Sequence, residues 1–189
     1  MTAALLELLN AHRPELGKET EDLQRMKAYA QSLEQPFSRN QSLAHFTGSA
    51  LLVDAVSSRV LLLHHQKLQR WLQPGGHAEE ADEGRLERTA LREAQEESGC
   101  RVRLFEGAPR PLDVDVHSIP ARPEAAGHLH LDVRFLLVAE NPEALAYDAQ
   151  ESEGARWLCF EQALEWADDV SLKRLLQKGR EVLSGRGAR

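Results

Sequence analysis

The 189-residue chain contains only two cysteines, Cys100 and Cys159, and its aromatic residues amount to 5%. Two cysteines provide neither a disulfide framework nor a cysteine-based metal cluster, and we interpret both as reduced thiols in the core. The sequence also lacks an apolar run of the ~20 residues that a membrane-spanning helix requires. These shortages argue against a small disulfide-stabilised protein and against a membrane-spanning one.

Basic residues are also in the minority. Lys and Arg number 23 and Asp and Glu number 30, which gives a formal net charge of −7. This balance argues against a protein that binds nucleic-acid polymers or anionic membranes by general attraction. The first residues contain no basic segment and include an early acid, Glu7, so we expect no signal peptide and a cytoplasmic location. A phosphorylated small molecule would have to be recruited by metal and by local arginines.

The composition that remains is that of a globular protein, with 42% hydrophobic and 28% charged residues. Apolar periodicity predicts two short helices, over 3–11 and 20–34, before Pro36. We expect residues 1–40 to form an N-terminal helical extension and residues 41–185 to form the main domain. The extension could be a lid, a dimer contact or a pair of helices packed against the main domain, and we favour packing. The sequence is compatible with a monomer and with a homodimer.

After residue 43 the pattern becomes strand-like. Strands are expected over 50–55, 60–64, 112–117, 129–135 and 156–159, with helices near 160–167 and 170–183. A Pro-rich loop, 120–127, joins two strictly alternating strands, and Pro74-Gly75-Gly76 is expected to be a loop. Strands with helices before, amid and after them predict an α/β/α layered domain with a mixed sheet.

The most informative segment is Arg92-Glu93-Ala94-Gln95-Glu96-Glu97-Ser98-Gly99. In a helix over 85–98, a rotation of about 100° per residue places Glu93 and Glu97 on the apolar stripe of Leu86 and Ala90. Glu96 lies within about 80° of that stripe. Buried carboxylates require a partner or a metal, so this register favours a hard divalent cation such as Mg²⁺ over a solvated charged face.

These residues resemble the box of the Nudix hydrolases, which reads G, five residues, E, seven residues, then R-E-U-x-E-E-x-G-U, where U is a bulky aliphatic residue. The invariant positions of its second half match Arg92, Glu93, Glu96, Glu97 and Gly99. The first half departs from the pattern, because Gly76 lies sixteen residues before Arg92 where the box has fourteen. This spacing implies a two-residue insertion between Gly76 and the helix. Counted back from Arg92, the isolated Glu of the box would fall on Gly84. Whether Asp82, Glu83 or neither takes that role is open.

The resemblance implies a Nudix-type α/β/α sandwich and Mg²⁺-dependent hydrolysis, with Mn²⁺ as a possible substitute. The expected substrate is a nucleoside diphosphate linked to another moiety, cleaved by water at a pyrophosphate phosphorus. The implied metal ligands are Glu93, Glu96, Glu97 and the carbonyl of Gly76, and Arg92 would hold a catalytic carboxylate in place. The base that activates water is expected to be Glu93 or a glutamate shortly before Trp157, either Glu151 or Glu153.

Two further contacts with substrate are predicted, from His77 and Arg134. Arg134 belongs to the polar faces of the two alternating strands, which otherwise fit a solvated side of an antiparallel sheet. His45 and His77 resemble metal ligands of isopentenyl-diphosphate isomerase, but Gly75 stands where that enzyme has its catalytic Cys. The alternatives to hydrolysis are therefore an isomerase-like enzyme and a non-catalytic Nudix domain that binds a nucleotide.

Overall fold

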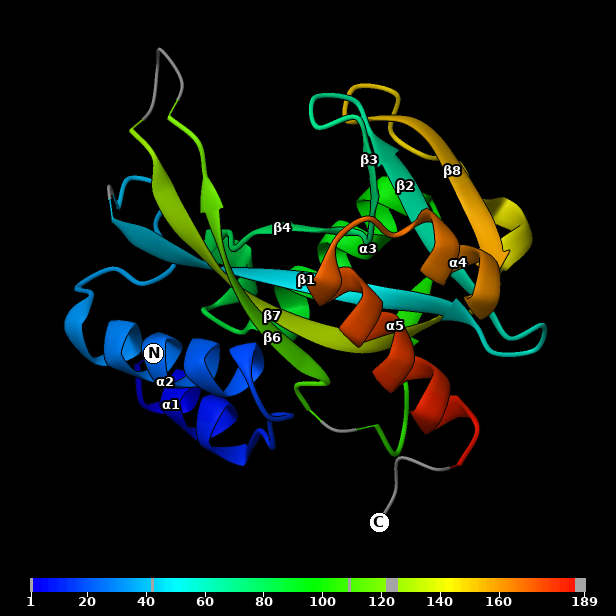
Figure 1. The fold of residues 1–189 in the computed structure, drawn as a ribbon. Coiled ribbons are helices and arrows are strands. Elements are labelled where there is room, and N and C mark those ends of the chain that lie inside the picture. The colour runs from blue at the N-terminus through cyan, green and yellow to red at the C-terminus, as the bar shows by residue number, and fades with distance from the viewer. Residues whose placement is uncertain (1, 42, 109, 122–125, 186–189) are drawn as a thin grey trace.

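A parallel pair of long strands, β1 (Ala44–Asp54) and β7 (His128–Ala139), forms the centre of the structure. The structure is a computed structural model that describes residues 2–41, 43–108, 110–121 and 126–185. All other strand pairs are antiparallel, so the sheet is mixed. Helices cover both of its sides (Figure 1).

The remaining strands are β2 (Arg59–His65), β3 (Arg70–Leu72), β4 (Gly75–His77), β5 (Val102–Leu104), β6 (Asp113–Ile119) and β8 (Ser152–Cys159). The helices are α1 (Thr2–Ala11), α2 (Lys18–Ser32), α3 (Leu86–Ser98), α4 (Phe160–Trp166) and α5 (Val170–Leu183), with short 3-10 turns at Glu80–Asp82 and Pro142–Ala144.

The sheet branches around its central pair. Its main path runs β3-β2-β1-β7-β5, while β4 pairs with β1, β6 with β7 and β8 with β2. Strands β4 and β6 therefore lie on opposite sides of the β1–β7 pair. Strand β4, the end of β6 and the beginning of β7 therefore lie near one another, at the end of the β1–β7 pair where β1 and β7 begin (Figure 1).

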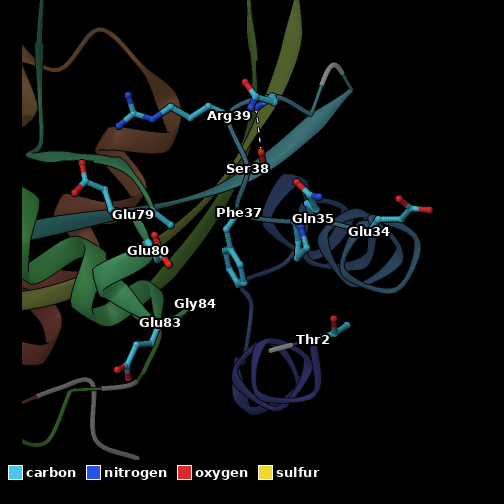
Figure 2. Close-up of a pocket in the computed structure, with 13 residues that line it drawn as sticks. Thr2, Glu34, Gln35, Phe37, Ser38, Arg39, Glu79, Glu80, Glu83 and Gly84 are labelled. Atoms are coloured by element: carbon cyan, nitrogen blue, oxygen red, sulfur yellow. Dashed lines mark hydrogen bonds between the residues drawn. The ribbon is translucent and has the colours of Figure 1, made fainter.

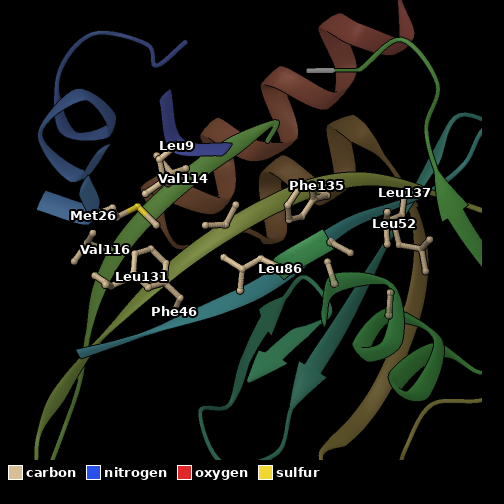
Figure 3. Packing of buried hydrophobic residues seen from close by; sticks show 14 of the residues in the cluster. Leu9, Met26, Phe46, Leu52, Leu86, Val114, Val116, Leu131, Phe135 and Leu137 are labelled. Carbon is tan, nitrogen blue, oxygen red and sulfur yellow. The ribbon is translucent and has the colours of Figure 1, made fainter. Parts of the chain in front are cut away.

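Strand β1 is buried along its whole length and supplies two cores. Phe46, Ala50 and Leu52 pack with α1, α2 and α3 on one side (Figure 3). Leu51 and Val53 pack with α4 and α5 on the other side. The alternation of a strand thus divides one apolar run between two layers, as an α/β/α sandwich requires.

Helices α1 and α2 pack against this domain rather than standing apart. Leu9 and Met26 are fully buried in the first core. Glu19 of α2 also accepts hydrogen bonds from His12 and from Lys178 of α5. The favoured packing interpretation is confirmed, and the division of the chain at residue 40 stays a prediction.

The helices and strands expected from periodicity are confirmed, with shifts at their ends, and two expectations are wrong. Pro74-Gly75-Gly76 was expected as a loop, but Gly75–His77 is strand β4, in which Gly76 pairs with Gly48 of β1. The carboxylates on the polar faces of β6 and β7 are not solvated, because Asp113, Asp115 and Asp132 are each no more than 2% exposed. Helices α2 and α5 cover Asp113 and Asp115 with basic side chains, namely Lys18, Arg174 and Lys178.

Both cysteines carry free thiols, with Cys100 buried and Cys159 half-buried. None of the helices in the described ranges is long and apolar enough to cross a membrane.

Candidate active site

Helix α3 carries the glutamates singled out in the sequence. Leu86, Ala90 and Ala94 are buried on the face that packs toward the sheet. The helix ends at Gly99, whose φ of 69° is the left-handed conformation that glycine adopts without steric penalty. Glu93 is 9% exposed on the same face, as the helical register predicts.

Beside this face lies a cavity of about 560 Å³. Its acidic lining comes from Glu93 and Glu97 of α3, Glu151 in the turn before β8, and Asp132 of β7. Strand β4 contributes Gly75, Gly76 and His77 to the same lining. Four elements that are distant in sequence therefore meet at one concave surface.

The carboxylate of Glu97 is held at the wall of the cavity. Its Oε2 accepts a hydrogen bond from the backbone N–H of Gly75 at 2.9 Å. Burial, followed by the neighbouring carboxyl groups of Glu151 and Glu93, raises the pKa of Glu97 to about 9. Within the described residues no basic side chain forms an ion pair with Glu97.

Glu93 lies directly against β4. A Cβ added to Gly76 would come within 2.5 Å of the Glu93 carboxyl carbon, so any larger residue would occupy the space of this carboxylate. Burial raises the pKa of Glu93, and the adjacent Arg92 guanidinium opposes that shift. The glycine therefore permits the close approach of strand and carboxylate.

Arg92 links α3 to the segments that precede it. Its guanidinium donates to the carbonyl of His77 at 2.8 Å, to Asp82 at 3.0 Å and to Glu93 at 2.9 Å. Asp82 also accepts from Thr89 of α3 at 3.0 Å. Asp82 and Glu83 were the two candidates for the role of the isolated Glu of the box. Asp82 contacts Arg92, whereas Glu83 is exposed and pairs with Arg88.

Two predicted acids lie outside the cavity lining. The Glu96 side chain is 59% exposed and accepts a hydrogen bond from Arg92 at 3.0 Å. Glu153 is 47% exposed and contacts His64 at 3.4 Å, so Glu151 is the one of the two loop glutamates that reaches the cavity.

Arg134 is not part of the cavity wall. Its side chain is 4% exposed and donates to Asp132, Asp113 and Ser171, so its guanidinium already serves partners inside the protein. This geometry argues against the predicted phosphate contact, and Arg134 holds the buried carboxylates of β6 and β7 together instead. The strand alternation revealed a common face but not that α2 and α5 would cover it.

Five histidines gather at the opposite wall of the cavity, four of them in its lining and His45 buried behind them. Sequence reasoning had singled out only His77, as a substrate contact, and His45, by the resemblance to the isomerase. The cluster consists of His45, His77, His117, His128 and His130. Its rings lie close together, and the His45 and His130 centroids are 4.8 Å apart. Burial, then neighbouring positive charge, lowers the pKa of His77 to about 4. The pairing of His117 with His130 across β6 and β7 was the signal that could have revealed the cluster.

His45 is the most buried member of this cluster, with 1% exposure. Neither of its ring nitrogens makes a hydrogen bond of ordinary geometry within the described part of the chain. Burial lowers its pKa to about 4, while a backbone interaction with Gln41 opposes that shift.

A second cavity, of about 590 Å³, lies between the connector after α2 and the loop that precedes α3 (Figure 2). Phe37 projects into the region between these segments, and Glu79, Glu80 and Glu83 line the opposite side. Arg39 lines both cavities. The second cavity has no comparable convergence of buried carboxylates.

The donor set of the first cavity suits a hard divalent cation. Carboxylate oxygens are the ligands that Mg²⁺ and Mn²⁺ prefer, and a dication would relieve the repulsion that raises the pKa of Glu97. The space left by Gly76 keeps the Glu93 carboxylate at the same wall. The residues present therefore fit the predicted cation.

Comparison with known proteins agrees with this arrangement. The family model for the NUDIX domain matches residues 45–179. An Ap4A hydrolase of C. elegans, solved as a binary complex, aligns at 18% identity over 74% of this chain and 98% of that one, with a TM-score of 0.53.

The E. coli dihydroneopterin triphosphate pyrophosphohydrolase aligns at 16% identity over 70% of this chain and 92% of that one, with a TM-score of 0.52. The NUDIX domain of Shewanella oneidensis NrtR, complexed with ADP ribose, aligns at 18% identity over 82% and 97%, with a TM-score of 0.50. At such identities the three structures establish a shared fold.

Proposed function

We propose that this chain, which belongs to the Nudix hydrolase family, cleaves the pyrophosphate bond of a nucleoside diphosphate linked to another moiety. We propose Mg²⁺ as the cation, with Mn²⁺ as a substitute. The alternatives raised by the sequence, a non-catalytic nucleotide-binding domain and an isomerase-like enzyme, are outcomes of the test below.

One observation carries this proposal: the carboxylates of Glu93 and Glu97 lie on the buried face of α3 and line a cavity together with Glu151. A solvated acidic face would have placed them in water, where no partner is needed.

Glu93 and Glu97 would hold the cation, together with the carbonyl of Gly76. Glu96 would join them after leaving Arg92, and an exposed ion pair of this kind contributes only about 0–1 kcal/mol to stability. When bound, the cation supplies Lewis-acid polarisation of the phosphoryl oxygens and neutralises part of the charge on the pyrophosphate.

The protein's own groups position the reactants. Arg92 fixes Glu93 through a direct hydrogen bond and fixes β4 through the carbonyl of His77. The base that accepts a proton from the attacking water would be Glu151 or Glu93, since both line the cavity. Glu151→Gln tests the first of these: it should abolish turnover if Glu151 is the base, and turnover that persists would assign the proton to Glu93.

Two exposed basic residues, Arg39 and Lys67, line the same cavity. Neither forms an ion pair within the described residues, so both are available to phosphate oxygens of the substrate. Together with His77 they would provide the local attraction that a chain with a net charge of −7 lacks overall. The cavity volume of about 560 Å³ falls in the range of roughly 300–1,000 Å³ that is common for small-molecule sites.

The test is a hydrolysis panel with Mg²⁺ that contains ADP-ribose, dinucleoside polyphosphates, nucleotide sugars, nucleoside triphosphates and isopentenyl diphosphate. The nucleotides in the panel are suggested by the Ap4A hydrolase and the ADP-ribose complex that share the fold. We expect phosphate or nucleotide release from a nucleoside diphosphate derivative. Tight binding without turnover would favour the non-catalytic alternative, and alkene migration would favour the isomerase-like one.

Glu97→Gln and Glu93→Gln are the decisive variants for the panel. Each should lower kcat by roughly 10²- to 10³-fold, because several kcal/mol of metal-dependent stabilisation would be lost. Glu87→Gln, on the same helix but outside the cavity lining, is the matched control. Ordinary activity of Glu97→Gln at ordinary Mg²⁺ concentrations would remove Glu97 from the proposed ligand set.

A further inference from the structure

We propose that His45, His128 and His130 bind a transition-metal ion of the zinc type, at a site separate from the carboxylates of α3. The three side chains come from the beginnings of the parallel strands β1 and β7. His128 and His130 line the cavity, and His45 is buried behind them. This site does not depend on the proposed hydrolysis, because it concerns ligands of different chemistry.

The geometry of the three imidazoles carries the proposal. Each offers one ring nitrogen, and the three nitrogens all lie within 4.8 Å of one another. Zinc–nitrogen bonds of about 2.0–2.1 Å in a tetrahedral site require nitrogens somewhat more than 3 Å apart, so small rotations of the rings bring them to ligand spacing.

His45 provides an independent observation. It is 1% exposed, and both of its ring nitrogens lack a hydrogen-bond partner of ordinary geometry among the described residues. Buried polar atoms are almost always paired, because leaving them without a partner is unfavourable. Its ring centroid lies 4.8 Å from those of both His128 and His130, and an ion between them would give it a partner.

A backbone contact leaves one ring nitrogen of His128 available to an ion. The Nδ1 of His128 lies 3.0 Å from the carbonyl of Ala126, and a hydrogen bond donated there leaves Nε2 as the ligand atom. Backbone carbonyls orient metal-binding histidines in this way in known sites. The Nε2 of His77 lies 3.2 Å from the Nε2 of His130, so His77 contacts one of the three proposed ligands directly.

The two ion sites differ in chemistry. Imidazole nitrogens select zinc and related transition ions, whereas carboxylate oxygens select Mg²⁺ and Mn²⁺. Three protein histidines are also a ligand set that leaves a fourth position on zinc for water or substrate. His128 and His130 line the same cavity as Glu93 and Glu97, so a ligand in the cavity could reach an ion held by these histidines.

The test is zinc titration of the full chain, produced without a histidine tag and stripped of metal by a chelator. With Mg²⁺ in excess to occupy the carboxylate site, we expect one zinc ion per chain, measured by calorimetry and elemental analysis. His128→Ala and His130→Ala should each weaken zinc binding by at least about 100-fold, more than the loss of an orienting partner produces. His64→Ala, which removes a histidine that contacts Glu153 instead, is the matched control and should bind as the unmodified chain does.

Carboxylate variants separate this site from the proposed active site. Glu93→Gln and Glu97→Gln should retain zinc affinity within about twofold, since neither residue belongs to the histidine site. Zinc binding that is lost in Glu97→Gln and retained in His130→Ala would overturn the proposal.

X-ray absorption of the zinc complex of the unmodified chain tests the proposal independently of whether the variants fold. Scattering from imidazole in the zinc shell is expected. A shell of oxygen atoms alone would overturn the assignment. Whether the chain hydrolyses any nucleotide affects neither result.

Discussion

At the scale of single residues, Gly76 shows how the absence of a side chain places a carboxylate. Strand β4 and helix α3 approach so closely that a Cβ at this position would meet the Glu93 carboxylate at 2.5 Å. The atoms it would displace belong to the tip of a flexible side chain, so the strand itself does not have to move. The position therefore affects the proposed chemistry more than the fold.

Gly76→Ala should accordingly lower kcat by roughly 10²-fold, because a displacement of about 1 Å of a positioned group has that effect. The thermal unfolding midpoint should change little. Gly154→Ala is the control, since a Cβ there meets only Trp71 at 4.0 Å. Steady-state kinetics and thermal unfolding of both variants check the prediction, and unchanged kcat in Gly76→Ala would contradict it.

The residue scale is also where the sequence was most and least informative. The register of Glu93 and Glu97 with Leu86 and Ala90 could be predicted, because it depends only on the local geometry of one helix. The contacts of Arg134 and the histidine cluster could not, because they depend on which distant elements cover a strand. The same limit applies to Glu96, which Arg92 draws away from the cavity.

At the scale of elements, the N-terminal helices are joined to the rest of the protein by a buried ion pair. Lys178 of α5 is 8% exposed and donates to Glu19 of α2 and to Asp113 of β6. Removing one member of a buried pair leaves the other charged without a partner. This contact couples three elements from different parts of the chain.

Lys178→Met should lower the free energy of unfolding by roughly 3–5 kcal/mol. Turnover per folded molecule should stay unchanged, because Lys178 is not part of the cavity lining. Lys173→Met replaces an exposed lysine of the same helix and should have almost no effect. Urea unfolding of both variants decides the matter, and equal stabilities would mean that the pair does not join the helices to the domain.

Elements with strong periodicity were predictable from the sequence, and short ones were not. Helices α2, α3 and α5 show the apolar spacing of an amphipathic helix, and β6 and β7 alternate. Strand β4 has three residues, two of them glycine, so it carries no such pattern. Its pairing with β1 is a long-range interaction that only the folded chain reveals.

At the scale of the whole molecule, buried carboxylates make stability depend on pH. Burial alone would raise the pKa of Asp115, but the hydrogen bond from His117 and the charges of Arg134 and Lys18 together lower it well below its ordinary value of 3.8. Hydrogen bonds from His12 and Lys178 similarly lower the pKa of Glu19 from 4.5, against the effect of burial.

A carboxyl group whose pKa is lowered by folding stabilises the protein fully above its unfolded pKa and progressively less as the pH falls below it. The free energy of unfolding should therefore decline below about pH 4.5 as these groups take up protons in the unfolded chain. Asp115→Asn should be less stable at neutral pH, and its difference from the unmodified chain should shrink between about pH 4 and pH 2. Urea unfolding across this range checks the prediction, and a difference independent of pH would contradict it.

The layered architecture was predictable from the order of strands and helices, because few arrangements bury their apolar faces. The branching of the sheet was not, since pairing partners depend on contacts between distant residues. That branching positions the cavity, because it brings β4 and the β6–β7 pair to one end of β1. The existence of a carboxylate site could be inferred from one helix, whereas its opposite wall required the fold.

The most direct test of the central claim is a crystal of the protein soaked in Mn²⁺ and measured for anomalous scattering. The account predicts an anomalous peak between the carboxylates of Glu93 and Glu97, at the manganese–oxygen distance expected for direct coordination. A map from active protein with no peak there, or with its manganese bound elsewhere, would contradict it.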